Sequence, residues 1–516
     1  MLLEDLARLS ATIASTSKRN LKIAHVAQCL RDAEPAERGL VALYLSGATR
    51  QGRLSVGYKQ IQSALEALAP EGANDLTLSE LDAQLEALQT LEGKGVNARR
   101  AALLRGLFER CHEQARRFVA ALLVGELRQG ALESLVLDAI AQAAGADKAA
   151  VRRAQMLRAD LREVCELAFS AGDAGLTAVR LKLFQPVQPM LAEPVTDIGA
   201  ALETLREPTF ELKMDGARVQ VHKQGEEVRV YSRALNEVSG SVPEVLELVR
   251  ALAVEDVVLD GEVIVLHADG TPVPFQQTMR RFGRKLDVEA LRRELPLSTF
   301  FFDCLHAGGE TLLDAPLSER AARLAALLPE GARMPRLVGG DAAAVQAFYE
   351  QALDRGHEGL MAKELGSPYM AGSRGSSWLK LKQAHTLDLV VLAAEWGSGR
   401  RTGSLSNLHL GARDPEQGGF VMLGKTFKGL TDELLRFQTR ELLARETSRD
   451  AYTVHVRPEL VVEVAFNDVQ TSPQYPGGVA LRFARVKRYR PDKTAAEADT
   501  LAQVRAFVRP GTANAP

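Results

Sequence analysis

The stretch ELKMDGAR, residues 211–218, determines how the middle of this chain is interpreted. If the stretch begins as a strand, its side chains alternate, so Glu211 and Lys213 share one face and the apolar residues take the other. The Asp215-Gly216 pair predicts a tight turn that returns Arg218 to the side of the lysine. Taken alone, the stretch fits either a lysine held in a pocket or a surface hairpin with a solvated lysine.

Three further carboxylates stand in motifs downstream. In the segment LDGE, residues 259–262, strand alternation places Asp260 and Glu262 on one face. Glu358 precedes a glycine in HEGLMAK, residues 357–363. Asp260 can be either a structural turn residue or a functional one, whereas Glu262 and Glu358 are candidate ligands for a metal ion.

The segment WLKLK, residues 378–382, predicts a strand with Lys380 and Lys382 on one face. A lysine with a pKa near 10.4 is about one part in a thousand neutral at pH 7.5, so a nucleophilic lysine needs nearby cations or desolvation. Lys380 and Lys382 are candidates to supply the cations for Lys213. Attack on an α-phosphate builds negative charge, which Mg²⁺ (or Mn²⁺) held by carboxylates can offset.

Length and composition set the wider frame. A chain of 516 residues favours three domains, and 46% hydrophobic with 25% charged residues excludes wholesale disorder, collagen and coiled coil. Lys plus Arg number 64 against 66 Asp plus Glu, so a nucleic-acid partner requires local basic patches. The four cysteines lack zinc-ligand spacing, and no membrane span or signal peptide is recognised. A cytoplasmic protein is expected, nucleoid-associated in a prokaryote.

The composition and hydrophobic pattern of the sequence change twice along the chain. Residues 1–185 are poor in proline and read as all-α, with a clear helix over 132–143 stopped by Gly145. A proline cluster from Pro186 to Pro194 predicts a linker. Residues 186–383 alternate strands and helices as an α+β domain, residues 384–508 fit a β-barrel of the OB type, and 509–516 read as a disordered tail.

The order and spacing of these motifs resemble those of the covalent nucleotidyltransferases. The whole chain resembles three-domain ATP-dependent DNA ligases. Motifs I, III, IV and V correspond to residues 213–216, 260–262, 358–363 and 378–382. Segments outside the middle domain match as well, including GELRQG at 125–130 and QPVQPMLA at 185–192. The resemblance implies an all-α DNA-binding domain, an adenylation domain and an OB-fold domain.

The resemblance also implies roles for individual residues. Lys213 becomes the adenylated lysine, and Glu262 and Glu358 become metal carboxylates. The implied ATP-binding residues are Glu211 and Phe302 at the adenine, Arg218, Arg233 and Glu262 at the ribose and phosphate, and Arg374, Lys380 and Lys382 at the phosphates. Motif VI includes Arg490, Asp492 and Lys493, and its cations are implied to orient the leaving pyrophosphate, with the segment 382–388 as a hinge.

The implied function is the sealing of nicks in duplex DNA through a lysyl-AMP enzyme and 5′-adenylated DNA. Arg128, with Gly125 and Gly130, is a candidate DNA contact in the helical domain. ATP is the expected cosubstrate, and a monomer without membrane association is expected. A sliding clamp stays open as a partner, since no convincing clamp-binding peptide is visible.

Other functions share some of these motifs. RNA ligases and mRNA capping enzymes use the same nucleotidyltransferase core, but most lack a helical module like residues 1–180. An NAD-dependent ligase would be expected to carry a four-cysteine zinc site. A catalytically silent DNA-binding clamp is disfavoured because Lys213, Glu262, Glu358 and Lys380 are all present.

Overall fold

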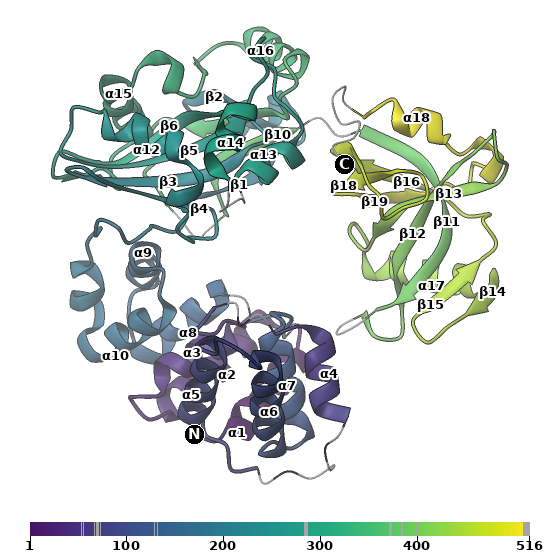
Figure 1. Ribbon diagram of the computed structural model, residues 1–516, viewed down its shortest axis with the longest axis horizontal. Coiled ribbons are helices and arrows are strands. Elements are labelled where there is room, and N and C mark those ends of the chain that lie inside the picture. Colours follow the sequence, from purple (N-terminus) through teal and green to yellow (C-terminus); the bar gives the residue numbers. More distant parts are fainter. Residues whose placement is uncertain are drawn as a thin grey trace.

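The computed structural model describes residues 1–52, 54, 56–66, 68, 72, 74–127, 129–131, 133–282, 287–370, 374–382, 385–397 and 401–508. Three parts follow one another along the chain: a helical part, a two-sheet part and a β-rich part, which lie in an arc in Figure 1. This order confirms the predicted fold class. No helix in the described part of the chain has the length and apolar character needed to cross a membrane.

The first part contains helices only, apart from one isolated bridge. They are α1 (Leu3–Ser15), α2 (Arg19–Asp32), α3 (Arg38–Leu45), α4 (Tyr58–Glu66), α5 (Leu78–Gln89), α6 (Val96–Glu109), α7 (Glu113–Leu123), α8 (Glu133–Ala144), α9 (Lys148–Arg158) and α10 (Leu161–Ala178). Local signals explain several boundaries. Thr77 caps α5 in a capping box with Glu80, Asp147 and Asp160 cap α9 and α10, and Gly145 follows α8 with φ of +67°.

The middle part is built on two five-stranded sheets, with orders β1-β10-β9-β2-β8 and β4-β3-β5-β6-β7. The strands are β1 (Leu191–Pro194), β2 (Pro208–Lys213), β3 (Ala217–Gln224), β4 (Glu227–Ser232), β5 (Asp256–Val265), β6 (Leu297–Ala307), β7 (Glu310–Thr311), β8 (Arg336–Val338), β9 (Gly359–Glu364) and β10 (Arg374–Lys382). The helices are α11 (Ile198–Thr204), α12 (Pro243–Arg250), α13 (Phe275–Phe282), α14 (Val288–Glu294), α15 (Leu317–Leu327) and α16 (Ala342–Asp354).

The third part is β-rich. Its strands are β11 (His385–Trp396), β12 (Leu405–Arg413), β13 (Phe420–Thr426), β14 (Glu446–Arg449), β15 (Thr453–Val456), β16 (Val461–Phe466), β17 (Asp468–Thr471), β18 (Val479–Arg482) and β19 (Arg485–Tyr489), with helices α17 (Asp432–Leu443) and α18 (Leu501–Arg505). The long strand β11 pairs with β12 on one side and with β15 and then β16 on the other. One strand thus joins both halves of an OB-like sheet, which encloses its own apolar cluster.

The segment between the helical part and the first sheet lies along strand β3. Phe184, with a left-handed φ of +65°, donates its N–H to His222 Nδ1 at 3.0 Å, and its carbonyl accepts from the Tyr231 hydroxyl at 2.8 Å. Val187 exchanges two hydrogen bonds with the Gln220 amide, at 2.7 and 3.1 Å. The linker is therefore fixed to the second sheet by side chains of that sheet.

His222 is a neutral acceptor in this arrangement. Burial, with a smaller contribution from His306, lowers its pKa from 6.5 to about 3. Its Nδ1 accepts from Phe184, so the proton lies on Nε2, which donates to Gln220 Oε1 at 2.9 Å. A proton added at Nδ1 would remove the acceptor that holds Phe184.

The depressed pKa of His222 predicts acid-sensitive stability. The unfolded chain takes up the proton near pH 6.5 and the folded chain only near pH 3, so the free energy of unfolding falls as pH drops through that window. The slope contributed by one such group is at most about 1.4 kcal/mol per pH unit. Because Asn keeps an acceptor near Nδ1 and does not titrate, His222→Asn should show a flatter melting-temperature profile from pH 7 to pH 5. Parallel profiles for the two proteins would contradict this assignment.

Candidate active site

Lys213 is the last residue of β2, where the chain leaves the first sheet. Residues 214–216 then cross to β3 in the second sheet, so the stretch 211–218 is no surface hairpin. A Cβ on Gly216 would come within 3.0 Å of Glu262 Cγ and closer still to a β5 carbonyl, so only glycine fits the crossing. The crossing places Lys213 between the two sheets, with its side chain 21% exposed.

Two lysines meet at one carboxylate oxygen. Glu358 Oε2 lies 2.5 Å from Lys213 Nζ and 2.7 Å from Lys382 Nζ. Sheet register explains the convergence, since Gly359 pairs with Lys213 on one side and with Lys382 on the other. A Cβ on Gly359, whose φ is +138°, would collide with the Leu381 carbonyl. The glycine after Glu358 is therefore required for the strands to approach.

Charge and burial shift the pKa values of this group. Burial alone would raise the pKa of Glu358, but the positive charges of Lys213 and Lys382 outweigh it and the pKa is lowered. Burial, followed by the charge of Lys213, lowers the pKa of Lys382. Glu358 is therefore ionised at neutral pH, and it relieves the repulsion between two ammonium groups.

Glu262 completes the surroundings of Lys213. It lies on β5 opposite Arg218 of β3, and burial raises its pKa to about 7 against the opposing charges of Lys213 and Arg218. A buried carboxylate with so high a pKa gains a proton easily and is stabilised in its charged form by a cation. Glu262 and Glu358 thus supply hard oxygen donors on opposite sheets beside the same lysine.

The donor set fits magnesium better than zinc. Among the residues that the structure describes, no three His, Cys, Asp or Glu side chains are arranged to hold a metal ion. Mg²⁺ binds commonly through one or two carboxylates together with substrate phosphates, whereas structural zinc takes four protein ligands. Two carboxylates beside a phosphate-binding lysine match the first case.

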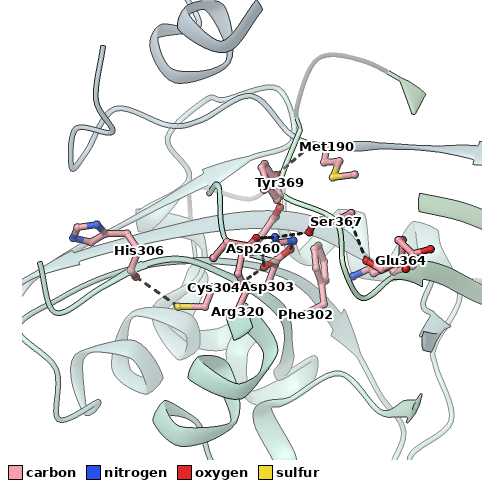
Figure 2. A network of polar contacts seen from close by, with 12 residues as sticks. Met190, Asp260, Phe302, Asp303, Cys304, His306, Arg320, Glu364, Ser367 and Tyr369 are labelled. Carbon is pink, nitrogen blue, oxygen red and sulfur yellow. Dashed lines mark hydrogen bonds and ion pairs between the residues drawn. The ribbon is translucent and has the colours of Figure 1, made fainter. Parts of the chain in front are cut away.

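Arg218 is hydrogen-bonded to Asp260, Tyr369 and Met190, which Figure 2 shows from close by. Its guanidinium bonds to both oxygens of Asp260, at 3.1 and 2.5 Å, and to the Met190 carbonyl at 2.6 Å. Asp260 is in the interior of strand β5 and only 1% exposed. Asp260 is therefore no turn residue: its carboxylate holds Arg218.

A second group of buried charges surrounds the predicted adenine residues. Glu211 is 1% exposed, and its two carboxylate oxygens pair with Arg336 and Lys363, both at 2.5 Å. Lys363 Nζ also lies 4.3 Å from the ring centre of Phe302 and 4.1 Å from that of Trp378. Burial lowers the pKa of Lys363. The contact of Glu211 and Phe302 with adenine stays a prediction.

The motif VI cations are paired within the β-rich part. Arg490 bonds to Asp388 at 2.9 Å and to Asp492 at 2.7 Å, and Lys493 lies 2.6 Å from Asp388. The contact with motif I comes instead from Arg482, whose Nη1 lies 2.5 Å from Asp215 Oδ2. In this arrangement the β-rich part touches the site through the end of β18, and motif VI is not brought to Lys213.

The remaining predicted residues are less closely gathered. Arg233 is exposed in the turn after β4, and Lys380 lies on β10 opposite Met361. The side chain of Arg374 and the whole of Arg128 fall outside the described residues. Gly125 and Gly130 have φ of +68° and +72°, so both take left-handed turns that favour glycine.

Sequence reasoning missed three residues of the site. Arg336 comes from a three-residue strand, β8, that no periodic pattern announces. Tyr369 lies in none of the numbered motifs identified from the sequence, and Lys363 appeared only as the end of motif IV. The pKa of Lys382 is lowered and that of Glu262 is raised, and both side chains lie beside Lys213. Perturbed pKa values are typical of active sites, and these residues form a site suited to nucleotidyl transfer.

Comparisons with known proteins identify the family of this chain. Family models match residues 59–141 ("DNA ligase N terminus"), 189–382 ("ATP dependent DNA ligase domain") and 401–493 ("ATP dependent DNA ligase C terminal region").

Relatives match over almost the whole chain. A "Probable DNA ligase" of Anaeromyxobacter sp. (strain Fw109-5) is 57% identical over 98% of this chain and 98% of its own length. Another, of Sorangium cellulosum (strain So ce56), is 53% identical over 98% of this chain and 95% of its own. The solved structure "Pmar-Lig_PreS3" has a TM-score of 0.63 at 17% identity, over 94% of this chain and 99% of that one, and shares the fold. The chain belongs to the family of ATP-dependent DNA ligases.

Proposed function

We propose that this ligase seals nicks in duplex DNA by passing AMP from ATP to Lys213 and then to the 5′-phosphate at the nick. The observation that carries the proposal is the shared carboxylate oxygen of Glu358, which lies between Lys213 and Lys382. A 3′-hydroxyl then displaces AMP and forms the 3′-5′ phosphodiester bond.

The first transfer needs the lone pair of Lys213 Nζ. Glu358 Oε2, 2.5 Å away, is placed to take up the proton. Nζ attacks the α-phosphorus, the bond from that phosphorus to the α,β-bridging oxygen breaks, and pyrophosphate leaves with the electron pair. A phosphoramidate between Lys213 and AMP results.

In each of the second and third transfers, one bond to phosphorus forms as another breaks. A 5′-phosphate oxygen of DNA attacks the AMP phosphorus, and the N–P bond breaks to regenerate the Lys213 amine. The 3′-hydroxyl oxygen then attacks the 5′-phosphorus, and AMP departs. Arg218, held by Asp260, is placed to bind the ribose or phosphate of the nucleotide through these steps.

Glu262 and Glu358 would hold a divalent ion, Mg²⁺ or Mn²⁺. When bound, such an ion offsets the negative charge that develops on the phosphate oxygens. Occupation by a cation would stabilise the charged form of Glu262, whose pKa burial raises to about 7.

The β-rich domain is proposed to act as a lid in the first transfer. In the present arrangement Arg490 and Lys493 pair with Asp388 and not with the site. Rotation about the segment 382–388 would bring them over the nucleotide to orient the leaving pyrophosphate. Residues 383 and 384 of this hinge lie outside the described residues.

The helical domain is proposed to supply DNA affinity through phosphate contacts. Gly125 and Gly130 flank the segment that carries Arg128. The buried Lys22 donates to the Gln129 carbonyl at 2.6 Å, and Gln129 is itself only 3% exposed. This hydrogen bond fixes the backbone at Gln129, next to Gly130, where contacts can position duplex DNA without reading sequence.

Removal of the Lys213 amine should abolish the covalent step. Lys213→Ala offers no nucleophile, and Lys213→Arg keeps a guanidinium that stays protonated at any usable pH. Neither protein should retain ³²P after incubation with [α-³²P]ATP and denaturing electrophoresis. An AMP adduct on Lys213→Ala that survives denaturing electrophoresis would refute the assignment of the nucleophile.

Glu262→Gln and Glu358→Gln should lower the rate of adduct formation and weaken its dependence on Mg²⁺. Loss of charge stabilisation worth several kcal/mol corresponds to a fall of at least about 100-fold. Adduct formation should be titrated with Mg²⁺ and the melting temperatures compared. If the remaining activity keeps the Mg²⁺ titration of the parent while stability drops, the two carboxylates are structural.

Arg490→Ala and Lys493→Ala should separate the steps of the reaction. Both should slow adduct formation from ATP, yet largely retain sealing of a nick that already carries 5′-AMP, because no pyrophosphate leaves in that reaction. Arg488→Ala is a matched control, since Arg488 pairs with Glu463 on the sheet surface at 2.7 Å and should leave both rates unchanged. Equal losses in both assays would rule out the lid.

A further inference from the structure

The linker to the helical domain ends on a nucleotide-site residue. Arg218, Gln220 and His222 alternate along one face of β3, and each bonds to the linker backbone. His222 accepts from Phe184, Gln220 bonds to both backbone groups of Val187, and Arg218 Nη1 donates to the Met190 carbonyl at 2.6 Å. The linker thus runs along β3, where every second residue bonds to it, as far as Arg218.

Tyr369 closes the arrangement at this end. Its hydroxyl donates to Asp260 at 2.8 Å and accepts from Arg218 Nη2 and from the Met190 N–H, both at 3.1 Å. A phenol has one hydrogen and two lone pairs, so this hydroxyl is saturated. Figure 2 shows Tyr369 between the Met190 backbone and Asp260.

The ring of Tyr369 is itself held firmly. It is 2% exposed and packs edge-on against Trp378, with ring centres 6.1 Å apart. Its backbone N–H donates to the Leu313 carbonyl at 2.8 Å, and the carbonyl of Ser367, two residues earlier, accepts from Arg320 at 3.0 Å. Arg320 forms a fully buried pair with Asp303. The hydroxyl therefore has a fixed position from which to orient other groups.

The network leaves Arg218 little freedom. Of five guanidinium hydrogens, Asp260 takes two, the Met190 carbonyl one and Tyr369 one. One Nη1 hydrogen has no acceptor among the residues that the structure describes. The direction of that hydrogen is set by the three partners together.

We propose that Tyr369 is a positioning residue that, with the backbone of Met190 in the interdomain linker, orients the free N–H of Arg218 toward the nucleotide. The inference rests on the proposed function of Arg218 in binding ATP. The linker is then part of the nucleotide site as well as a tether for the DNA-binding domain. A rotated Arg218 would still pair with Asp260 but would meet the ribose or phosphate in the wrong direction.

Tyr369→Phe tests the proposal in the full-length protein, and Tyr231→Phe is the matched control. Tyr231 is also a buried tyrosine, and its hydroxyl also holds a linker carbonyl, that of Phe184, but it does not touch Arg218. The probe is ATP with a methylene in place of the α,β-bridging oxygen, titrated by calorimetry with Mg²⁺. Tyr369→Phe should bind it about five- to tenfold more weakly, the effect expected when Arg218 loses one of the hydrogen bonds that orient it. Tyr231→Phe should bind it like the parent.

A purely structural role predicts a different result. In that case both variants would lose melting temperature to a similar extent and bind the analogue equally well, and the proposal would be overturned. Weaker binding by both variants in equal measure would overturn it too, because the effect would then come from the linker and not from Arg218.

A kinetic readout separates this inference from the proposed function. Tyr369→Phe should raise the ATP concentration that half-saturates adduct formation while the maximal rate changes less. Analogue binding precedes the covalent step, so failure of the parent to form an adduct would refute Lys213 as nucleophile and leave the binding comparison valid. No binding of the analogue by the parent would refute both.

Discussion

The site depends on the ion pairs that the Glu358 carboxylate forms with Lys213 and Lys382. Two ammonium groups that converge on one point repel each other strongly where little water screens them. Glu358 Oε2 lies within 2.7 Å of the Nζ atoms of Lys213 and Lys382. The two lysines lie at the ends of strands that both pair with β9. Removing one member of such a buried group leaves an uncompensated charge, so strand register and site chemistry support each other.

The two-sheet design follows from the same point. Lys213 ends a strand of one sheet and Arg218 begins a strand of the other, with only the crossing at 214–216 between them. Glu262 reaches the crossing from the second sheet and Glu358 from the first. A nucleotide bound here would therefore contact both sheets, and residues far apart in sequence would meet at it.

Local sequence patterns predict much of this site. The other residues are brought to it by contacts between distant segments, which local patterns do not reveal. Strands form at 259–262 and 378–382 with the regular pairing that the predicted alternation requires, whereas the close approach of strands at the glycine after Glu358 is found only in the structure. Strand alternation cannot show that 211–218 crosses between sheets, because a tight turn looks the same in both cases. Arg336 and Tyr369 reach the site only through tertiary packing, from segments without a pattern of their own.

The two junctions between domains differ physically, and this difference fits a division of labour. The helical domain joins through a backbone that Arg218, Gln220, His222, Tyr231 and Tyr369 all bind. Across the other junction, Arg482 pairs with Asp215, and these side chains are 12% and 16% exposed. An ion pair between two side chains can exchange its partner for a phosphate at little net cost, whereas a row of side-chain-to-backbone hydrogen bonds, several of them buried, must break together. The helical domain should therefore move with the nucleotide pocket, while the OB-like domain is the one free to change its position between steps.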